Sequence, residues 1–377
     1  MGKLQKLVYT VKKKGFSKET ANIIMYGVQK NVLNFPEQSL SYPTNAHVEV
    51  TSRCNLKCLM CPRAVPDEKL GNMSIAQFTK ILDDIPYLQN VSLQGLGEPT
   101  LSPHFFDFVR ICKERNITST TVSNATIYTE ELAKNLATCG LAQINISIDG
   151  ATKETYEAIR VGAKWEAMLA NARKVIQYRN ESGSKTRIHM SGVLMKSNYH
   201  ELPQFVQLAH DIGFDELRFW HVNYGWNTNI SNPGESLLFI HDDPAVDEKI
   251  KEATALAQKL GLRLVLPKMK IDKIACGWPW HSVYITWDGN IAPCSVMYDT
   301  FFGNMFKEPF EKIWNNPSYV MFRRNLKKTT EWATEQTAGQ EPPLGVIRDC
   351  IGCTFQRCEF YSASEGKGPS PVATYEA

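Results

Sequence analysis

The sequence lacks the features that mark membrane and secreted proteins. None of its apolar runs approaches the ~20 consecutive residues that a membrane-crossing helix requires, so we expect no membrane partner. The N-terminus has no continuous apolar core and no small-residue cleavage site, which argues against a signal peptide. An internal repeat is also missing. We therefore predict a cytoplasmic protein without repeat architecture.

A strong charge of one sign is absent as well. The 377 residues carry a net charge of +3, which is too small at this length to imply a nucleic-acid partner. Lys12, Lys13 and Lys14 form a basic run, which we interpret as the solvated face of a helix. Hydrophobic residues make up 43% and charged residues 21%, as in ordinary soluble globular proteins, so general disorder is excluded.

Cysteine, in contrast, is abundant, with ten in the chain. Disulfides seldom persist in the cytosol, so clustered cysteines there usually bind metal or do chemistry. Cys112 and Cys139 stand apart, on a predicted amphipathic helix and near a helix end, and we expect both to be buried as small apolar side chains. The other eight form two groups, which are Cys54, Cys58 and Cys61, and then Cys276, Cys294, Cys350, Cys353 and Cys358.

Short apolar runs alternate with helical periodicity from residue 47 onward, which indicates an α/β fold. The predicted strands are 47–51, 90–94, 119–123, 143–148, 187–195 and 216–222. The predicted helices are 74–85, 105–115, 129–138, 165–179 and 201–212. Six such βα units form a parallel sheet that curves into a partial (β/α)6 barrel, with the reactive groups at the C-terminal ends of the strands.

The chain divides into four predicted parts. Residues 1–46 form an N-terminal helical cap without chemistry of its own, and 47–268 form the barrel, which a helix at 246–260 and a strand at 262–266 close. Residues 269–362 form a small module held by a metal cluster, in which the tight turn Asp288-Gly289-Asn290 predicts a hairpin. The last part, 363–377, is a Gly/Ser/Pro-rich tail that we expect to be mobile.

The first cysteine group follows directly on the first predicted strand. Three thiolates in so short a loop can hold three irons of a [4Fe–4S] cube and leave the fourth iron without a protein ligand. That open iron can chelate the amino and carboxylate groups of S-adenosylmethionine (SAM) and pass an electron into its sulfonium. Zinc is the alternative, but structural zinc sites usually show paired CxxC spacing and four ligands.

This CxxxCxxC loop, Cys54-Asn-Leu-Lys-Cys58-Leu-Met-Cys61, resembles the defining motif of the radical SAM superfamily. The likeness covers roughly residues 45–265. It implies that SAM is cleaved to methionine and a 5′-deoxyadenosyl radical, which abstracts a hydrogen atom from the substrate. In such enzymes the protein supplies orientation and shielding from water.

The resemblance also implies which residues bind SAM. Gly97 and Glu98, in the sequence Gly95-Leu96-Gly97-Glu98, match the family motif that binds the SAM amino group, although Leu96 departs from the usual second glycine. Arg160 is expected to clamp the SAM carboxylate, and Met60 to pack on the adenine. Polar residues at the ends of two strands are expected to contact the ribose and carboxylate, or to cap helices instead. They are Ser123, Asn124, Ser147 and Asp149.

The second cysteine group resembles a SPASM domain, the cluster-binding extension of many radical SAM enzymes. Only five cysteines follow residue 270, so we expect the shortened twitch form with one auxiliary [4Fe–4S] cluster; a zinc site is the alternative. Cys358 is left over as a hydrogen-atom donor, a replacement ligand or a bystander. The four expected ligands are Cys276, Cys294, Cys350 and Cys353.

Four protein ligands suit an auxiliary cluster that accepts an electron from a substrate radical. Our first hypothesis is therefore an oxidoreductase that dehydrogenates a sugar or cyclitol, with a donor such as flavodoxin or ferredoxin reducing the SAM cluster. Residues 1–46 lack a strand-rich pattern typical of peptide-binding domains. Crosslinking, thioether formation or epimerisation of a ribosomally made peptide is the alternative, and a non-catalytic, metal-held binding protein is a third. Residues 221–227 are polar and aromatic and lie where substrate should enter.

Overall fold

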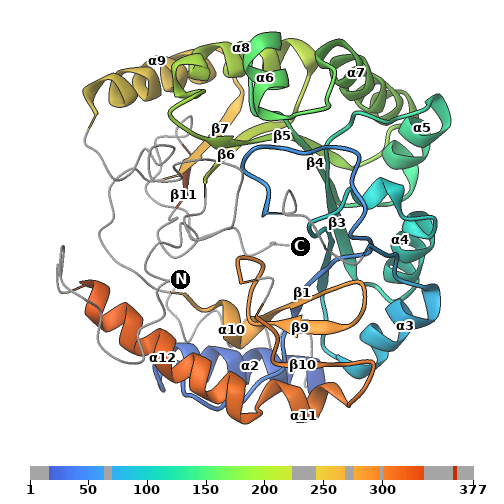
Figure 1. Cartoon of the computed structure of the whole chain (residues 1–377), viewed down its shortest axis with the longest axis vertical. Helices are drawn as coiled ribbons and strands as arrows, with labels where there is room; N and C mark the ends of the chain where they lie inside the picture. The colour runs from blue at the N-terminus through green and yellow to red at the C-terminus, as the bar shows by residue number, and fades with distance from the viewer. Residues whose placement is uncertain are drawn as a thin grey trace.

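The computed structural model describes residues 17–62, 70–222, 243–267, 276–297, 300–334 and 360–362. Within them lies one curved sheet of strand order β10-β9-β8-β1-β2-β3-β4-β5-β6-β7-β11 (Figure 1). The strands from β8 through β1 to β7 are parallel, and the outer three are antiparallel to their neighbours. Their bounds are β1 (Asn45–Val48), β2 (Asn90–Leu93), β3 (Thr118–Ser123), β4 (Gln143–Ser147), β5 (Arg187–Leu194), β6 (Glu216–His221), β7 (Arg263–Pro267), β8 (Ser282–Ile285), β9 (Asn290–Ala292), β10 (Gly303–Asn304) and β11 (Phe360–Ser362).

Helices cover the outer, convex side of this sheet in Figure 1. Local signals set their ends: Ser74 begins one with a capping box, and Gly183, Gly213 and Gly261 end three others in the left-handed conformation. No helix among the described residues is both long and apolar enough to cross a membrane. The helices are α2 (Lys18–Asn31), α3 (Ile75–Asp84), α4 (Phe105–Glu114), α5 (Glu130–Thr138), α6 (Lys153–Ile159), α7 (Trp165–Ser182), α8 (Leu202–Ile212), α9 (Pro244–Leu260), α10 (Trp278–His281), α11 (Phe310–Trp314) and α12 (Pro317–Thr334).

The predicted α/β architecture is confirmed, and each predicted strand and helix of the barrel is present within a few residues of its expected bounds. Several other elements were not predicted, among them helix α6 of the barrel and the C-terminal helices α11 and α12. Helix α6 is seven residues long, too short to show a helical period in sequence. Strand β8 was expected in a separate module, yet it pairs in parallel with β1. The predicted hairpin follows at once, since β9 returns antiparallel to β8 through Gly289 (φ +89°). The C-terminal module therefore continues the barrel sheet.

The two faces of the sheet differ in chemistry. In β4, Ile144 and Ile146 belong to the buried apolar core under the helices, and Gln143, Asn145 and Ser147 lie on the other face. Because the strands are paired in parallel register, the polar face continues from β4 across the neighbouring strands. One layer across the concave side consists of His47, Ser92, Thr120, Gln143 and Arg187. The interior of the barrel is thus built for hydrogen bonding.

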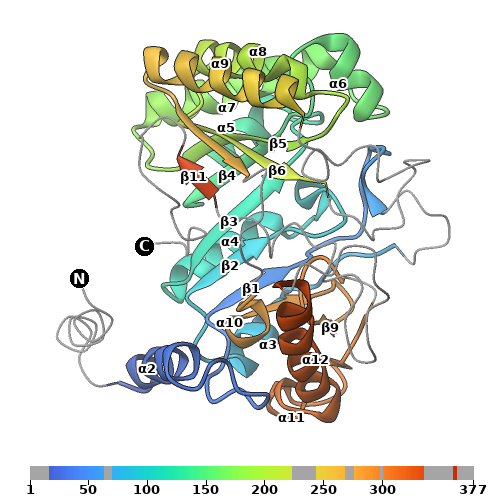
Figure 2. The same ribbon diagram turned by 90° about the vertical axis from the view of Figure 1, so that its left-hand side faces the viewer.

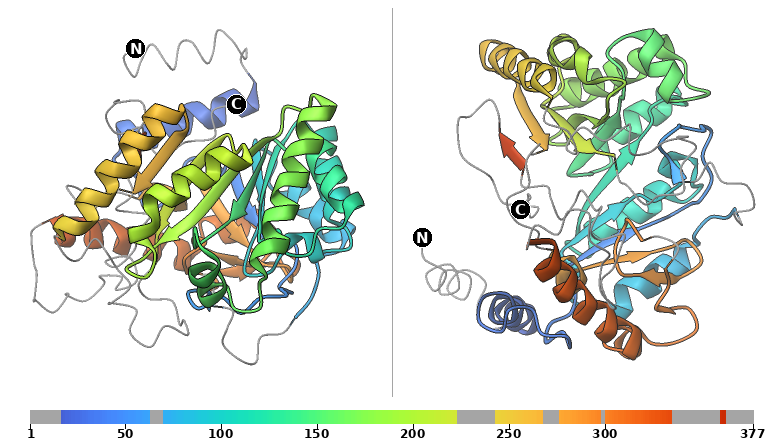
Figure 3. Two further views of the ribbon diagram at one scale, coloured as in Figure 1. Left: turned by 90° about the horizontal axis from the view of Figure 1, so that it is seen from above. Right: turned by 60° about the vertical axis from the view of Figure 1, so that its left-hand side comes forward.

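The N-terminal segment joins the barrel to the C-terminal helices. Gln29 of α2 is fully buried, and its amide donates to the Ser41 hydroxyl at 2.8 Å and to the Trp280 carbonyl at 3.4 Å. The Trp280 indole donates to the Pro36 carbonyl at 2.6 Å. Arg324 of α12 pairs with Glu37 at 2.7 Å. Figures 2 and 3 show the resulting arrangement, with α2 beside α10 and α12.

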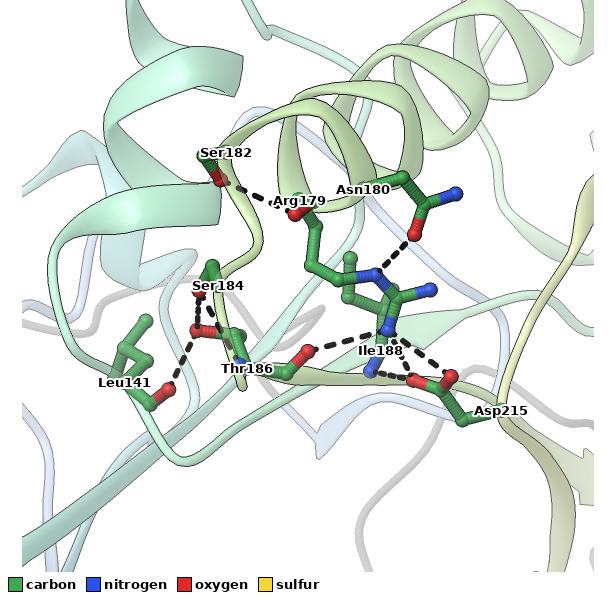
Figure 4. A network of polar contacts seen from close by, with 8 residues as sticks. All are labelled: Leu141, Arg179, Asn180, Ser182, Ser184, Thr186, Ile188 and Asp215. Atoms are coloured by element: carbon green, nitrogen blue, oxygen red, sulfur yellow. Dashed lines mark hydrogen bonds and ion pairs between the residues drawn. The ribbon is translucent and has the colours of Figure 1, made fainter.

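A polar network fixes the turn from α7 into β5 (Figure 4). Arg179 donates to the Thr186 carbonyl and pairs with Asp215 at 2.7 Å, and Asp215 accepts from the Ile188 N–H at 2.6 Å. The Thr186 hydroxyl donates to the Leu141 carbonyl at 2.7 Å. A cavity of about 510 Å³ lies beside this turn, at the N-terminal ends of β2 to β5. None of the residues lining it is a cysteine or a carboxylate, and it lies at the end of the barrel away from the cysteine loop.

Candidate active site

The first cysteine loop leaves the C-terminal end of β1 and is held on both sides. On one side, the Thr51 hydroxyl donates to the Asn72 side-chain oxygen at 2.6 Å and also accepts from the Arg53 N–H at 3.1 Å. On the other side, the Lys57 N–H donates to the Val161 carbonyl and the Leu59 N–H to the Ile159 carbonyl, both at 3.0 Å and both at the C-terminal end of α6. Cys54, Cys58 and Cys61 are half-buried on this loop, and none of them forms a disulfide.

Gly97 and Glu98 lie against the start of the loop. A Cβ at Gly97 would stand 2.1 Å from the Thr51 carbonyl oxygen, so no larger residue fits here without movement. The Glu98 N–H donates to the Arg53 carbonyl at 2.8 Å. The end of β2 and the cysteine loop are therefore packed backbone to backbone, which explains the glycine.

The Glu98 carboxylate is buried and accepts hydrogen bonds from the end of β3. The Ser123 hydroxyl and the Asn124 N–H each donate to it at 2.7 Å, and the Thr100 hydroxyl does so at the same distance. Burial raises the pKa of Glu98, and these hydrogen bonds oppose the rise. Glu98 and Ser123 thus connect the segment after β2 to the end of β3. Their contact with SAM, which the sequence predicts, stays a prediction.

Asn124 is the strand-end residue that faces the cysteines. Its amide nitrogen lies 4.0 Å from the Cys54 sulfur and donates to the Asn55 side chain at 3.0 Å. Ser147, at the end of β4, is half-buried on the polar face beside Ser191. Both residues therefore lie at the C-terminal edge of the sheet, as expected for groups near a cofactor.

Asp149 and Arg160 form an ion pair beneath Cys58. The Asp149 carboxylate is fully buried, lies 2.7 Å from Nε of Arg160, and accepts from the Val193 N–H at 2.7 Å. Burial raises the pKa of the Cys58 thiol to about 12, and the charge of Arg160 opposes this rise. Asp149 is therefore placed to position Arg160, whereas the sequence predicts direct contact of both residues with SAM.

Met60 lies in a small apolar cluster of its own. Its buried neighbours are Ile159, Met195 and Val222, which come from three different elements around the cysteine loop. An apolar surface next to Cys58 suits the flat face of a purine. Contact with adenine stays a prediction.

Glu49 is a buried carboxylate that the sequence reading did not single out. It follows β1 and accepts from the Leu96 N–H at 2.8 Å and from the Tyr284 hydroxyl at 3.0 Å. A Cβ at Gly95 would stand 2.5 Å from its side chain. A charged residue between Val48 and Val50 was the available signal, because an acid inside an apolar strand needs partners.

Two of the C-terminal cysteines lie within the described residues, and each has a tyrosine for a neighbour. Cys276 packs in a cluster with Tyr26, Phe35 and Trp280. Burial raises the pKa of Tyr26 and the adjacent Cys276 raises it further; burial raises the pKa of Tyr319 too, with Cys294 adding to the rise. Cys350, Cys353 and Cys358 lie outside the described residues, as does 223–227 of the predicted substrate stretch.

The donor set of the first loop is three thiols, which suits three irons of a [4Fe–4S] cube. In the part of the chain that the structure describes, no three histidine, cysteine or acidic side chains converge on a single ion. A cube takes one thiolate at each iron, so its ligands surround the cluster and do not meet at one point. Cys112 is fully buried on α4, as predicted, whereas Cys139 at the end of α5 is only half-buried, short of the burial predicted for it.

Comparison with known families decides the identity of this arrangement. The family model described as the Radical SAM superfamily matches residues 48–209, from β1 into α8. This chain contains a radical SAM domain. A second model, SPASM, described as an iron–sulfur cluster-binding domain, matches residues 276–337. The radical SAM chain therefore uses SAM and [4Fe–4S] clusters, with an auxiliary cluster in its SPASM domain.

Two curated relatives align with most of this radical SAM chain. The tungsten-containing aldehyde ferredoxin oxidoreductase cofactor-modifying protein of Pyrococcus furiosus is 29% identical, over 74% of this chain and 82% of the relative. The PqqA peptide cyclase of Rhodopseudomonas palustris is 25% identical, over 86% of this chain and 82% of the relative. Streptococcus suis SuiB, in its crystal structure bound to precursor peptide SuiA, shares the fold with a TM-score of 0.62 at 16% identity, over 90% of this chain and 75% of that one.

Proposed function

We propose that this radical SAM enzyme modifies a ribosomally made peptide. The observation that carries the proposal is the alignment with a peptide cyclase along most of both chains. SuiB, whose fold is similar, was crystallised with a precursor peptide. These relatives favour the peptide alternative over oxidation of a sugar or cyclitol, which was our first hypothesis from the sequence.

The concave face of the sheet supports a peptide substrate. Its layers present hydroxyls, amides and an imidazole, among them Ser147, Asn145 and His47. An extended peptide exposes a backbone donor and acceptor at nearly every residue, and each needs a partner when it leaves water. A polar barrel interior can supply these partners without relying on one particular side chain of the substrate.

We assign the cofactor roles to residues of the cysteine end of the barrel. When bound, SAM and its cluster supply the 5′-deoxyadenosyl radical that removes a hydrogen atom from the substrate. Cys54, Cys58 and Cys61 would hold the cluster. Arg160, positioned by Asp149, would bind the SAM carboxylate, and the apolar group around Met60 would shield the adenine.

The test follows the hydrogen atom that the radical removes. Peptide extracts from cells grown on perdeuterated amino acids are incubated anaerobically with the enzyme, SAM and dithionite, and the 5′-deoxyadenosine is examined by mass spectrometry. Deuterium in the 5′-deoxyadenosine, above the level obtained with unlabelled peptides, is the expected result. A loss of two hydrogen atoms from one peptide, which is two mass units in the unlabelled form, would identify a crosslinking or oxidative reaction.

The matched control uses deuterated sugars and cyclitols with unlabelled peptides. Deuterium transfer from that pool alone would overturn the peptide proposal and restore the first hypothesis. An enzyme with alanine at Cys54, Cys58 and Cys61 should transfer no deuterium from either pool, which separates enzymatic transfer from background exchange.

A further inference from the structure

The N-terminal segment, expected to carry no chemistry, lies against a predicted ligand of the auxiliary cluster. A Cβ at Gly277 would stand 3.0 Å from Cζ of Phe35 and 3.4 Å from Oη of Tyr26. Gly277 directly follows Cys276, and all three packed side chains, Tyr26, Phe35 and Cys276, border the same apolar cluster. Two aromatic residues from the start of the chain thus cover the cysteine from one side.

The conformation of Phe35 shows that this contact is held against a local cost. Asn34 and Phe35 both have positive φ, +47° and +55°, where side chains with a Cβ are rarely found. Such strain persists only where surrounding contacts enforce it, and it clusters at functional sites. Here the Phe35 N–H donates to the Gln29 carbonyl at 2.7 Å, and its ring packs on Trp280 with centroids 4.8 Å apart.

Tyr26 has an available hydroxyl at this place. Its ring is fixed edge-to-face against His281, with centroids 5.4 Å apart. Among the described residues the Tyr26 hydroxyl has no hydrogen-bond partner. The Tyr319 hydroxyl, near Cys294, differs because it donates to the Ala292 carbonyl at 3.4 Å. This half-buried phenol of Tyr26, beside the predicted ligand Cys276, is therefore placed to donate a hydrogen bond to sulfur.

We propose that Tyr26 and Phe35 complete the auxiliary cluster site at Cys276, with Tyr26 donating a hydrogen bond to sulfur and Phe35 excluding water. Hydrogen bonds to sulfur and exposure to solvent both set the potential of such clusters. The inference rests on Cys276 as a ligand and does not depend on which substrate the enzyme modifies. The two residues act in opposite directions, because the hydrogen bond and the surrounding water each stabilise the more negative, reduced cluster.

The experiment is a redox titration of the auxiliary cluster, followed by electron paramagnetic resonance. The full chain with alanine at Cys54, Cys58 and Cys61 serves as parent, so that only the auxiliary cluster contributes a signal. In this parent, Tyr26→Phe should lower the reduction equilibrium constant about tenfold, which is about 59 mV for one electron. Phe35→Leu should shift the midpoint in the other direction and make the cluster bleach faster in air.

Tyr42→Phe is the matched control, because Tyr42 belongs to the same segment but contacts Tyr87 and Phe310 and lies outside the Cys276 cluster. An unchanged midpoint in Tyr26→Phe at full iron content would overturn the proposal. So would an equal shift in Tyr42→Phe, since the effect would then belong to the whole segment. If the parent protein shows no paramagnetic signal from an auxiliary cluster, Cys276 is not a cluster ligand and the proposal is wrong.

Discussion

The fully buried carboxylate of Asp149 lies 2.7 Å from the guanidinium Nε of Arg160, directly beneath the Cys58 loop. The carboxylate comes from the end of β4 and the guanidinium from the residue that ends α6, so the pair joins the sheet to the segment on which the cysteine loop rests. A buried pair of this kind is worth little compared with apolar packing, but removing one partner leaves a buried charge alone.

Asp149→Asn should therefore destabilise the protein by about 3 kcal/mol and weaken SAM binding about tenfold, because Arg160 loses its fixed position. Thermal unfolding and anaerobic equilibrium binding of SAM measure the two effects. Asp215→Asn is the control, since Asp215 pairs with Arg179 at the same 2.7 Å in a more exposed position away from the cysteine loop. Equal SAM affinity in the two variants would contradict the positioning role.

Alanine at Cys54, Cys58 and Cys61 should abolish formation of 5′-deoxyadenosine and leave the iron of the auxiliary cluster, about four atoms per chain. Iron and sulfide are measured after anaerobic reconstitution. Cys112→Ala is the matched control, because Cys112 is fully buried on α4 and should keep all its iron and its activity. SAM cleavage that persists in the triple variant would refute the assignment of the first cluster.

Gly97→Ala should lower the iron content of the SAM cluster, because its Cβ would meet the Thr51 carbonyl oxygen at 2.1 Å and push the cysteine loop aside. Gly183→Ala serves for comparison. Gly183 has φ +66° but no atom within 4 Å of an added Cβ, so this change should cost about 1 kcal/mol of stability and no iron. The iron content of both variants is measured after anaerobic reconstitution. Equal iron in the two variants would show that the cysteine loop tolerates the displacement.

Stability should fall as the pH is lowered through the range in which partly buried histidines resist protonation. Burial lowers the pKa of His47 from 6.5 to about 4, so the folded state stays neutral where the unfolded state binds a proton. Between about pH 7.5 and about pH 6, His47 alone should cost about 1 kcal/mol of unfolding free energy.

His47→Gln should reduce this pH dependence by that amount, measured by denaturant unfolding of identically prepared proteins. Glutamine retains a polar group toward Gln94, whose amide nitrogen lies 3.1 Å from the His47 ring. The comparison is between the pH dependences of the unfolding free energy, so a pH-independent loss of packing against Trp278 does not affect it. His281 also has its pKa lowered to about 4, by burial first and then by Lys30, and should account for part of the remaining slope. Identical slopes would show that His47 is already protonated or exposed.

The sequence alone determined the barrel elements and the chemistry of its first loop. Apolar periodicity predicted β2 and α4, because strands and helices of this length bury one regular face. The spacing of Cys54, Cys58 and Cys61 predicted the cluster and SAM, because three thiolates on one short loop suit three irons. Local signals of this kind survive without knowledge of the fold.

The tertiary structure decided what depends on contacts between distant segments. It placed β8 beside β1, buried Asp149 against Arg160, and brought Tyr26 and Phe35 to Cys276, about 250 residues further along the chain. No sequence period records such pairings, because each depends on how the sheet curves and where the chain returns. Tyr26 and Phe35, which the sequence places in an N-terminal cap without chemistry, therefore lie beside a predicted cluster ligand.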